Sequence, residues 1–224
     1  MSKKLSKGLF VTFEGGEGSG KTTLLEKLYQ TLKELDYDVI KTRAPGGTAL
    51  GISIRSLVLH HQHMKICERA ELLLFLTDRA QHVQEVILPA LREGKIILCD
   101  RFTDSTMAYQ LGARKIEEGE WLEKLCDFGC YSLKPDLTFF LSIEPKIGLA
   151  RAKSAIVQEG KESFDRLESE ALKFHEHVFE HYQKLASREP NRIKTIDAKK
   201  PLQEVFLAAK NHLMESLRGP YAAL

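Results

Sequence analysis

Residues 9–22 read Leu-Phe-Val-Thr-Phe-Glu followed by Gly15-Gly16-Glu17-Gly18-Ser19-Gly20-Lys21-Thr22, and these last residues fit the pattern G-x-x-x-x-G-K-[ST]. The apolar run before the pattern has the composition of a short buried strand. Residues 23–29 place apolar side chains at helical spacing. A glycine-rich loop between a strand and a helix N-terminus directs backbone N–H groups at phosphate oxygens. This stretch therefore predicts a phosphate-binding loop in a protein that binds a nucleoside triphosphate.

Two side chains of the loop and two that come later carry the chemistry of triphosphate binding. Lys21 supplies positive charge near the β- and γ-phosphates, and the hydroxyl of Thr22 is a ligand for Mg²⁺. Asp100 directly follows the apolar run 96–99, so we predict that it ends a buried strand and holds Mg²⁺, directly or through water. The alternative role for Asp100 is a helix cap. Arg101 is predicted to face the phosphates, where a guanidinium can bind two oxygens.

Composition limits the class of protein. The chain has 224 residues and a formal net charge of +2, with Lys+Arg 33 against Asp+Glu 31. This balance argues against a protein that coats nucleic acid or a membrane surface. The four cysteines form no C-x-x-C pair, which fits a reducing cytoplasm. The N-terminal residues lack the apolar stretch of a signal peptide, and no later run has the length and apolarity of a membrane span.

Short β-prone segments alternate with helical ones along the chain. The predicted strands are Leu9–Phe13, Asp38–Thr42, Lys95–Cys99, Asp136–Ile143 and Arg192–Ile196. The predicted helices are Lys21–Leu35, Leu50–His60, Glu68–Arg92, Glu117–Leu133, Pro145–Val157, Arg166–Ser187 and Pro201–Leu217. This alternation predicts an α/β fold with a doubly wound, five-stranded parallel sheet flanked by helices, and a ligand at the carboxyl ends of the strands. We expect a single domain over residues 1–224.

Two segments suggest roles beyond the core of the domain. The stretch Ser154–Ser163 has weak periodicity and a central glycine, so residues 151–165 are predicted to form a mobile lid that closes over the triphosphate. Within Glu68–Arg92, Leu72-Leu73-Leu74-Phe75-Leu76 is apolar all round, as in a helix buried on more than one side. The helix packs either centrally in its own domain or against a second subunit, and both alternatives remain open.

Three groups of residues predict a second pocket that faces the phosphate loop. The first is the turn-rich loop 42–48, which carries Arg43. The second is Phe75 and Arg79, which are four residues apart and share one helix face. The third follows Arg101 at helical spacing and comprises Thr106, Tyr109 and Gln110. Taken singly, each residue also suits a surface charge or a packed aromatic. Together they provide arginines for a phosphate and aromatic rings for a base.

These ordered motifs resemble the thymidylate kinase (dTMP kinase) family of P-loop nucleoside monophosphate kinases along nearly the whole chain. The matching stretches are residues 13–23, 42–48, 73–82, 100–105, 108–110, 135–141 and 165–168. The resemblance implies a P-loop NTP hydrolase fold and transfer of the γ-phosphate of MgATP to dTMP, giving dTDP and ADP in dTTP biosynthesis. It also implies a cytoplasmic homodimer whose partners are ATP and dTMP rather than nucleic acid or membrane.

The resemblance further implies roles for the residues of the second pocket. Phe75 would stack on thymine, and Arg79 would donate to its O4 atom, where cytosine presents an amino donor instead. The remaining acceptor-site roles are Thr106 and Gln110 at the base edge, Tyr109 against the deoxyribose, Glu17 at the 3′-hydroxyl, and Arg43 and Arg101 on the acceptor phosphate. Phosphate-loop residues 15–22 would bind ATP, with Lys21 and Arg101 catalytic.

The chain departs from the family pattern in two places. Ala44 stands where the family usually has glutamate, which removes a carboxylate near the acceptor phosphate. Glu17 and Ser19 leave the phosphate loop without an arginine, so the lid is expected to supply the catalytic cation. Arg151 is the first candidate and Lys153 the second, although arginine and lysine are not equivalent in clamping a phosphoryl group; Lys161 is the remaining basic residue of the lid.

Two other functions and one other kind of site fit parts of the sequence less well. The nearest alternative is a kinase for another nucleoside monophosphate or for a deoxynucleoside, which the combination of Phe75, Arg79 and Tyr109 disfavours. A nucleotide-dependent switch is less favoured, because a switch needs no second pocket. The spacing of His175, His177 and His181 is expected to reflect a solvated helix face rather than a zinc site.

Overall fold

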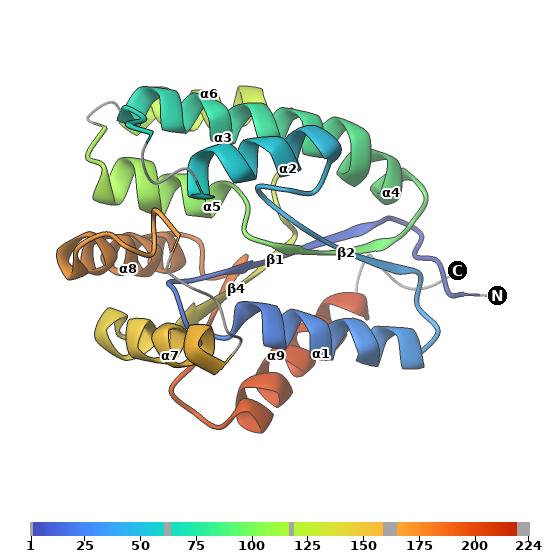
Figure 1. Cartoon of the computed structure of the whole chain (residues 1–224). Helices are drawn as coiled ribbons and strands as arrows, with labels where there is room; N and C mark the ends of the chain where they lie inside the picture. The colour runs from blue at the N-terminus through green and yellow to red at the C-terminus, as the bar shows by residue number, and fades with distance from the viewer. Residues whose placement is uncertain (1, 61–63, 117–118, 159–164, 219–224) are drawn as a thin grey trace.

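Strand β1 (Leu9–Glu14) lies at the centre of an all-parallel sheet in the order β2-β3-β1-β4-β5 (Figure 1). The computed structural model describes residues 2–60, 64–116, 119–158 and 165–218. The other strands are β2 (Val39–Arg43), β3 (Ile96–Asp100), β4 (Leu137–Ser142) and β5 (Ile193–Asp197). Each predicted strand is confirmed within one residue at either end, and so is the doubly wound α/β fold.

Helices follow the strands as the hydrophobic spacing predicts. Those after β1 and β2 are α1 (Lys21–Glu34), then α2 (Ala49–Arg55) with its π-helical extension η1 (Ser56–His60). The predicted helix 68–92 is continuous but divides into α3 (Glu68–His82), a π-helical turn η2 (Val83–Ile87) and α4 (Leu88–Arg92). The later helices are α5 (Thr103–Thr106) with η3 (Met107–Ala113), α6 (Gly119–Gly129), α7 (Pro145–Gln158), α8 (Leu172–Arg188) and α9 (Leu202–Leu217).

Two predicted helix boundaries are wrong, and one helical segment was not predicted. Helical residues 103–113 were not predicted as an element, and the predicted helix 117–133 ends at Gly129, its first two residues lying outside the described chain. The helix predicted from Arg166 begins only at Leu172. The carboxylate of Asp165 accepts the backbone N–H groups of residues 167 and 168 at 2.9 and 2.8 Å, which favours a turn over a continuous helix there.

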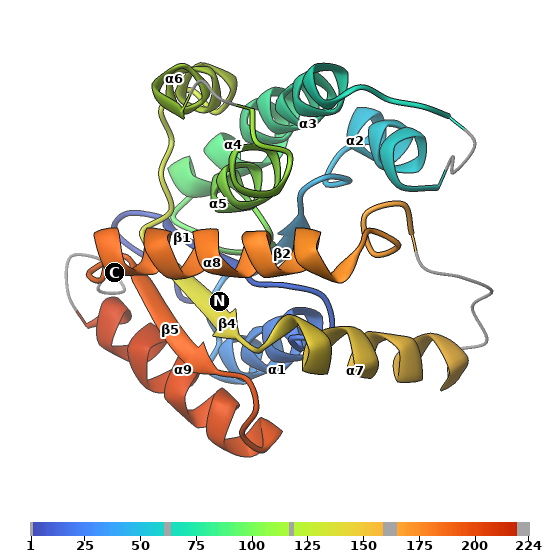
Figure 2. The same cartoon turned by 90° about the vertical axis from the view of Figure 1, so that its left-hand side faces the viewer.

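The two faces of β1 are covered by different helices. Leu9, Val11 and Phe13 pack with α1 and α9, whereas Phe10 faces η2 and contacts the ring of Phe102 at 4.9 Å between centroids. Figures 1 and 2 show α1 and α9 on one side of the sheet and α3, α4 and α5 on the other. Full burial of each such side chain contributes about 1.5–3 kcal/mol. Strand β1 is therefore held on both faces, and its carboxyl end is fixed in place.

The parallel register gathers the functional motifs at one edge of the sheet. Asp100 of β3 pairs with Phe13 of β1 and with Arg43 of β2. The phosphate loop, the loop after β2 and the Asp100–Arg101 pair consequently leave the sheet side by side. Ligands of open α/β sheets bind at this edge. Within the described ranges, no helix combines the length and apolarity needed to cross a membrane.

Candidate active site

A cavity of about 810 Å³ opens at the carboxyl edge of the sheet. The walls come from the phosphate loop, the loop after β2, helix α3, the helical segment after Asp100, helix α7 and the turn before α8. Most of the predicted site residues line it: Glu17, Gly18, Ser19, Gly20, Lys21, Thr22, Arg43, Phe75, Arg79, Asp100, Arg101, Thr106, Tyr109 and Gln110. Its volume lies in the upper part of the range typical of ligand pockets.

The phosphate loop wraps around the ammonium group of Lys21. The Nζ atom donates to the carbonyl oxygens of Gly15 at 3.0 Å and Gly16 at 2.8 Å, and to the Oγ of Ser19 at 3.2 Å. Gly20 has φ of 86° at the N-terminus of α1, a left-handed conformation that favours glycine. This turn leaves the first N–H groups of α1 unpaired within the helix and ready for an anion.

Thr22 and Asp100 supply oxygens that fit a divalent cation. The Oγ1 of Thr22 donates to Oδ2 of Asp100 at 3.0 Å. The other carboxylate oxygen, Oδ1, is buried and has no hydrogen-bond partner in the part of the chain that the structure describes. A buried carboxylate oxygen without a donor is costly, and such oxygens are preferred ligands of Mg²⁺. Among the described residues, no cluster of three His, Cys, Asp or Glu side chains could hold a metal, so phosphate oxygens and water would complete the coordination.

The titration of Lys21 leads to a prediction for the pH dependence of ATP use. Burial lowers the pKa of Lys21 to about 8. The free enzyme therefore loses the cation as the pH rises through about 8, and kcat/KM for ATP is expected to fall about tenfold per pH unit above that value. Bound phosphates favour the ammonium form, so kcat should stay flat further into the alkaline range. Initial rates with the expected acceptor, dTMP, at saturation from pH 6.5 to 9.5 test this; a flat kcat/KM profile would contradict it.

Helix α7 packs directly against the phosphate loop through two glycines. A β-carbon at Gly148 would overlap the carbonyl oxygen of Glu17, and a β-carbon at Gly18 would overlap the carbonyl oxygen of Gly148. Gly18 also has φ of 63°. The first turn of α7 and the loop are thus in backbone contact, with no room for side chains between them.

This contact predicts that Gly148→Ala disturbs both stability and ATP binding. Overpacking of this kind costs about 1–3 kcal/mol, which corresponds to roughly 2–10 °C in Tm for a chain of this size. KM for ATP should rise about tenfold, because one misplaced phosphate contact is worth on the order of 1.4 kcal/mol. Differential scanning fluorimetry and initial rates measure the two effects. Lys146→Ala, an exposed neighbour on α7, is the control and should change neither.

Arg79 lies in the second half of the cavity with unused hydrogen-bond donors. Its side chain is buried, at 2 % relative exposure, and Nη2 donates to the Oγ1 of Thr106 at 3.4 Å. The Nε and Nη1 atoms are buried without a partner among the described residues. The guanidinium carbon lies 4.8 Å from the centroid of the Phe102 ring. Buried unpaired donors are costly, so this site suits a ligand with acceptor atoms, beside the ring of Phe75.

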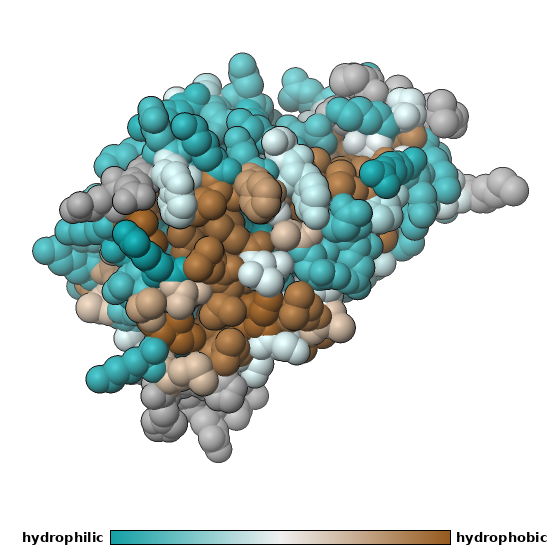
Figure 3. Space-filling view, turned by 90° about the horizontal axis from the view of Figure 1, so that it is seen from above, coloured by the Kyte–Doolittle hydropathy of each residue, from teal (hydrophilic) through white to brown (hydrophobic). Residues whose placement is uncertain are grey.

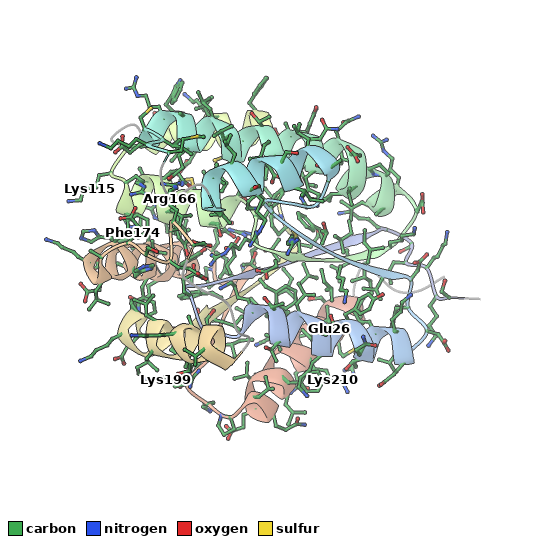
Figure 4. The ribbon with its side chains drawn as sticks, in the orientation of Figure 1. Glu26, Lys115, Arg166, Phe174, Lys199 and Lys210 are labelled. Carbon is green, nitrogen blue, oxygen red and sulfur yellow. The ribbon has the colours of Figure 1, made fainter. Side chains whose placement is uncertain are left out.

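Glu71 on α3 fixes the orientation of Gln110. Its carboxylate accepts from Nε2 of Gln110 at 2.9 Å, from Nε and Nη2 of Arg114 at 3.2 Å, and from Nη2 of Arg166. Arg114 also lies over the ring of Phe174 at 4.7 Å, and Figure 4 shows Arg166 and Phe174 on the same side of the molecule. Since a carboxylate only accepts, the amide nitrogen of Gln110 must face Glu71. The amide oxygen is then left for a donor on a ligand.

Glu17 connects the two halves of the cavity. Its Oε1 accepts from Nη2 of Arg101 at 2.8 Å and from the hydroxyl of Tyr109 at 2.7 Å. Burial opposes ionisation, but the charges of Arg101 and Lys21 outweigh it and lower the pKa of Glu17 to about 2. Glu17 is therefore a carboxylate at neutral pH, with lone pairs directed into the side of the cavity where Tyr109 lies.

Comparison with known proteins then identifies the family. A family model described as thymidylate kinase matches residues 13–208. The chain belongs to the thymidylate kinase family. It is 47% identical over 211 residues to the thymidylate kinase of Protochlamydia amoebophila, covering 93% of each chain. It is 46% identical over 209 residues to that of Pelobacter propionicus, covering 93% of this chain and 95% of the relative.

A solved structure supports the same assignment. The crystal structure of thymidylate kinase from Ehrlichia chaffeensis superposes with a TM-score of 0.74 at 30% identity, over 93% of this chain and 99% of that one. The predicted resemblance and the predicted enzyme class, a phosphotransferase, are confirmed. Members of this family transfer a phosphoryl group from ATP and generally need a divalent metal, which the oxygens of Thr22 and Asp100 fit.

Within this thymidylate kinase fold, the two candidate cations of the predicted lid stand apart from the cavity. Arg151 donates from Nη1 to the carbonyl oxygen of Ala198 at 2.7 Å, and Lys153 is exposed; neither lines the cavity, whereas Ala152 and Ala155 do. Residues 159–164 of the predicted lid, with Lys161, lie outside the described residues. At the other departure from the family, Ala44 is buried, and its N–H donates to the carbonyl oxygen of Asp100 at 3.0 Å.

Sequence reasoning missed two features of the thymidylate kinase site. Glu14, Ser105 and Tyr182 form a buried network beside Arg101; the only signal for it was an ionisable residue at the end of the apolar strand 9–13. The expectation of a solvated histidine face is wrong for His175, which is buried. Its partner Phe174 belongs to the core around Tyr109, so this turn of α8 faces inward.

Proposed function

We propose that this chain transfers the γ-phosphate of ATP to dTMP, giving dTDP and ADP. The observation that carries the proposal is the pair Phe75 and Arg79 on α3, in the same cavity as the phosphate loop. The ring of Phe75 offers a stacking surface for a base, worth about 1–3 kcal/mol. The unpaired buried donors of Arg79 suit the O4 acceptor of thymine and reject the amino group of cytosine.

In this proposal, catalysis consists of positioning and charge stabilisation. The acceptor phosphate is already a nucleophile, so no side chain need act as a general base. Lys21 and Arg101 hold charge that develops on the transferring group, and Arg43 binds the acceptor phosphate at the exposed rim. Thr22 and Asp100 would hold Mg²⁺, which would supply positive charge to the bound triphosphate. Thr106 and the amide oxygen of Gln110 meet the base edge.

The contacts to the sugar follow from the network around Glu17. Glu17 accepts from the 3′-hydroxyl of the acceptor nucleotide, and Tyr109 lies against the deoxyribose, leaving no room for a 2′-hydroxyl. Residues 151–165 are proposed as the lid, with Arg151 or Lys153 as the cation that reaches the γ-phosphate. For Arg151 this requires exchange of its bond to Ala198 for a bond to phosphate.

An acceptor panel tests the proposed substrate. ADP formation from ATP is measured with dTMP, dUMP, dCMP, thymidine and no acceptor. We expect dTMP to give the highest kcat/KM, and dCMP to be at least about 10²-fold poorer because the site would leave buried donors facing donors. A preference for another monophosphate would indicate a kinase for that nucleotide, and a preference for thymidine would indicate a deoxynucleoside kinase. ATP hydrolysis that is equal with and without every acceptor would favour a nucleotide switch.

We also propose a homodimer, formed by the apolar face above the sheet. Leu73 of α3 is 55% exposed, and Phe128 of α6 is 84% exposed. Trp121, seven residues before Phe128 on α6, is also exposed and lies on the same face of that helix. Figure 3 shows apolar side chains gathered on the side of the molecule where α3 and α6 lie in Figure 1. Contiguous exposed apolar surface of this kind marks an interface. Helix α3 was predicted to pack either within its own domain or against a second subunit. In this proposal it does both, because Leu72 and Leu76 are buried within the domain while Leu73 faces the partner.

The dimer proposal predicts that Leu73→Glu yields a monomer. A charge placed in an apolar contact and left without a partner costs several kcal/mol, enough to shift dissociation by about 10²-fold or more. Sedimentation velocity across a concentration series measures the change. Leu207→Glu, at an exposed position of α9 on the opposite side of the sheet, is the control and should leave the oligomeric state as in the parent. A parent that is monomeric throughout would refute the proposal.

The compartment proposed for this enzyme is the cytoplasm. All four cysteines are free, and three of them, Cys99, Cys126 and Cys130, are buried. Free thiols are typical of proteins kept in a reducing compartment.

A further inference from the structure

Arg101 has an unusual backbone conformation that its neighbours must maintain. It has φ of 68°, in the left-handed region that residues with a β-carbon rarely adopt. Its own N–H donates to the carbonyl oxygen of Phe13 at 3.0 Å. The next N–H, of Phe102, donates to Oε1 of Glu14 at 2.7 Å. Glu14 is thus one of the two groups that hold the peptide on either side of Arg101.

The second oxygen of Glu14 acts on the Arg101 side chain through two hydroxyls. Ser105 and Tyr182 both donate to Oε2 of Glu14, at 2.6 and 2.8 Å. The two hydroxyls also hydrogen-bond to each other at 2.8 Å, where either can donate, and each hydroxyl oxygen keeps a lone pair for a further donor. Nη1 of Arg101 donates to these two oxygens, each at 3.3 Å, and to the carbonyl oxygen of Gly15 at 3.0 Å. A carboxylate can only accept and a guanidinium can only donate, so Glu14 and Arg101 set the two ends of this network.

These contacts leave a defined set of donors on Arg101. Nη1 is occupied by Gly15 and the two hydroxyls, and Nη2 uses one proton on Glu17. Nη2 keeps its second proton, and the neighbouring Nε–H is the other donor on that edge of the guanidinium. Two neighbouring donors of one guanidinium suit the bidentate grip of a phosphate. Burial raises the pKa of Glu14, whereas its three hydrogen bonds favour the ionised form.

We propose that Glu14 is the positioning residue for Arg101: Oε1 holds the backbone, and Oε2, through Ser105 and Tyr182, orients the guanidinium toward the acceptor phosphate. This inference rests on the proposed function, since it assigns a cause to the placement of the acceptor-side arginine. It assigns Tyr182 of α8, far along the chain, to the same task. The carboxylate of Asp104 accepts from Nη1 of Arg192 at 2.7 Å. This ion pair anchors α5, the helix that also carries Ser105.

Glu14→Gln is the isosteric test. A carboxamide cannot accept at both ends, so either Phe102 N–H or the hydroxyl pair would face a donor. We expect kcat/KM for dTMP to fall about 30- to 300-fold, as for loss of a preorganised donor, with KM for ATP within twofold of the parent. Tyr182→Phe removes one arm only and should lose about 2- to 13-fold, the range of a single typical hydrogen bond. Glu180→Gln, on the exposed face of α8, is the control and should match the parent.

A double-mutant cycle with Arg101→Ala separates positioning from general destabilisation. If Glu14 and Tyr182 act through Arg101, adding either substitution to Arg101→Ala should lower kcat/KM by less than threefold. Losses that multiply in the Arg101→Ala background would overturn the inference, and so would a Glu14→Gln enzyme with parental kcat/KM. If Glu14→Gln does not fold, as judged by its melting transition, the Tyr182→Phe cycle decides alone. These rates are measured with the acceptor that the acceptor panel identifies. An incorrect substrate assignment would therefore show in the parent enzyme, whereas an incorrect role for Glu14 would show only in the double-mutant cycle.

Discussion

Lys21→Ala is expected to lower kcat by about 10³-fold, the upper range for removal of a preorganised donor at developing charge. The ammonium group is held by two loop carbonyls and Ser19, so the loop presents it as a fixed charge to the phosphates. KM for ATP should rise as well, since the same charge binds the ground state. Steady-state rates with saturating dTMP measure both parameters.

The control for Lys21 is chosen on the same helix. Lys33→Ala removes an exposed lysine from the last turn of α1 and should leave kcat and KM near the parental values. A melting temperature for each variant shows whether the loop still folds. A Lys21→Ala enzyme that is folded and retains more than a tenth of the parental kcat would contradict the role given to Lys21.

Arg79→Ala is expected to lower kcat/KM for dTMP by about 10²- to 10³-fold while leaving ATP binding nearly unchanged. The estimate follows from losing a charged hydrogen-bonding group in a buried pocket, which is worth about 2.5–4 kcal/mol. Titration of the enzyme with a fluorescent ATP analogue reports the phosphate loop, and initial rates report the acceptor site. Arg79 and Lys21 lie in different halves of the cavity. Arg79→Ala should therefore impair mainly the use of the acceptor, and Lys21→Ala mainly the use of ATP.

The control for Arg79→Ala removes another arginine from the same helix, α3. Arg69→Ala on the first turn of α3, an exposed position, removes the same charge from the helix without touching the cavity and should have parental kinetics. Equal loss of ATP binding and acceptor use in Arg79→Ala would mean that Arg79 supports the fold and does not read the base. Discrimination between dTMP and dCMP should fall together with kcat/KM for dTMP, because Arg79 is assigned to the O4 position.

The strands and the phosphate loop could be predicted from sequence because their patterns are local. Apolar runs such as 96–99 and 137–141 are buried on both faces, and hydrophobic content alone reveals such strands. The parallel order then brings Arg43, Asp100 and the loop to one edge without further information. Helical residues 103–113 were missed because Thr-Asp-Ser-Thr has weak helix propensity. That segment is held by tertiary bonds from Ser105 to Glu14 and from Asp104 to Arg192.

The finer contacts of the site could not be predicted from sequence. Nothing in the spacing of residues indicates that Tyr182 meets Glu14, because side-chain pairing across a fold depends on how helices dock. The burial of His175 was missed for the same reason, since α8 carries polar residues on its inward turn. The roles assigned to the pocket residues stay predictions, among them the lid cation, for which Arg151 and Lys153 lie away from the cavity.

The bond between Tyr182 and Glu14 joins residues 168 positions apart. Contacts of such sequence separation form late when a chain folds, since a long loop must close before the contact contributes. Strands β1, β2 and β3 and helix α1 lie in the first hundred residues, whereas β4, which pairs with β1, and α7, which packs against the phosphate loop, come later in the chain. The contacts that hold Arg101 therefore become complete only when α8 has docked.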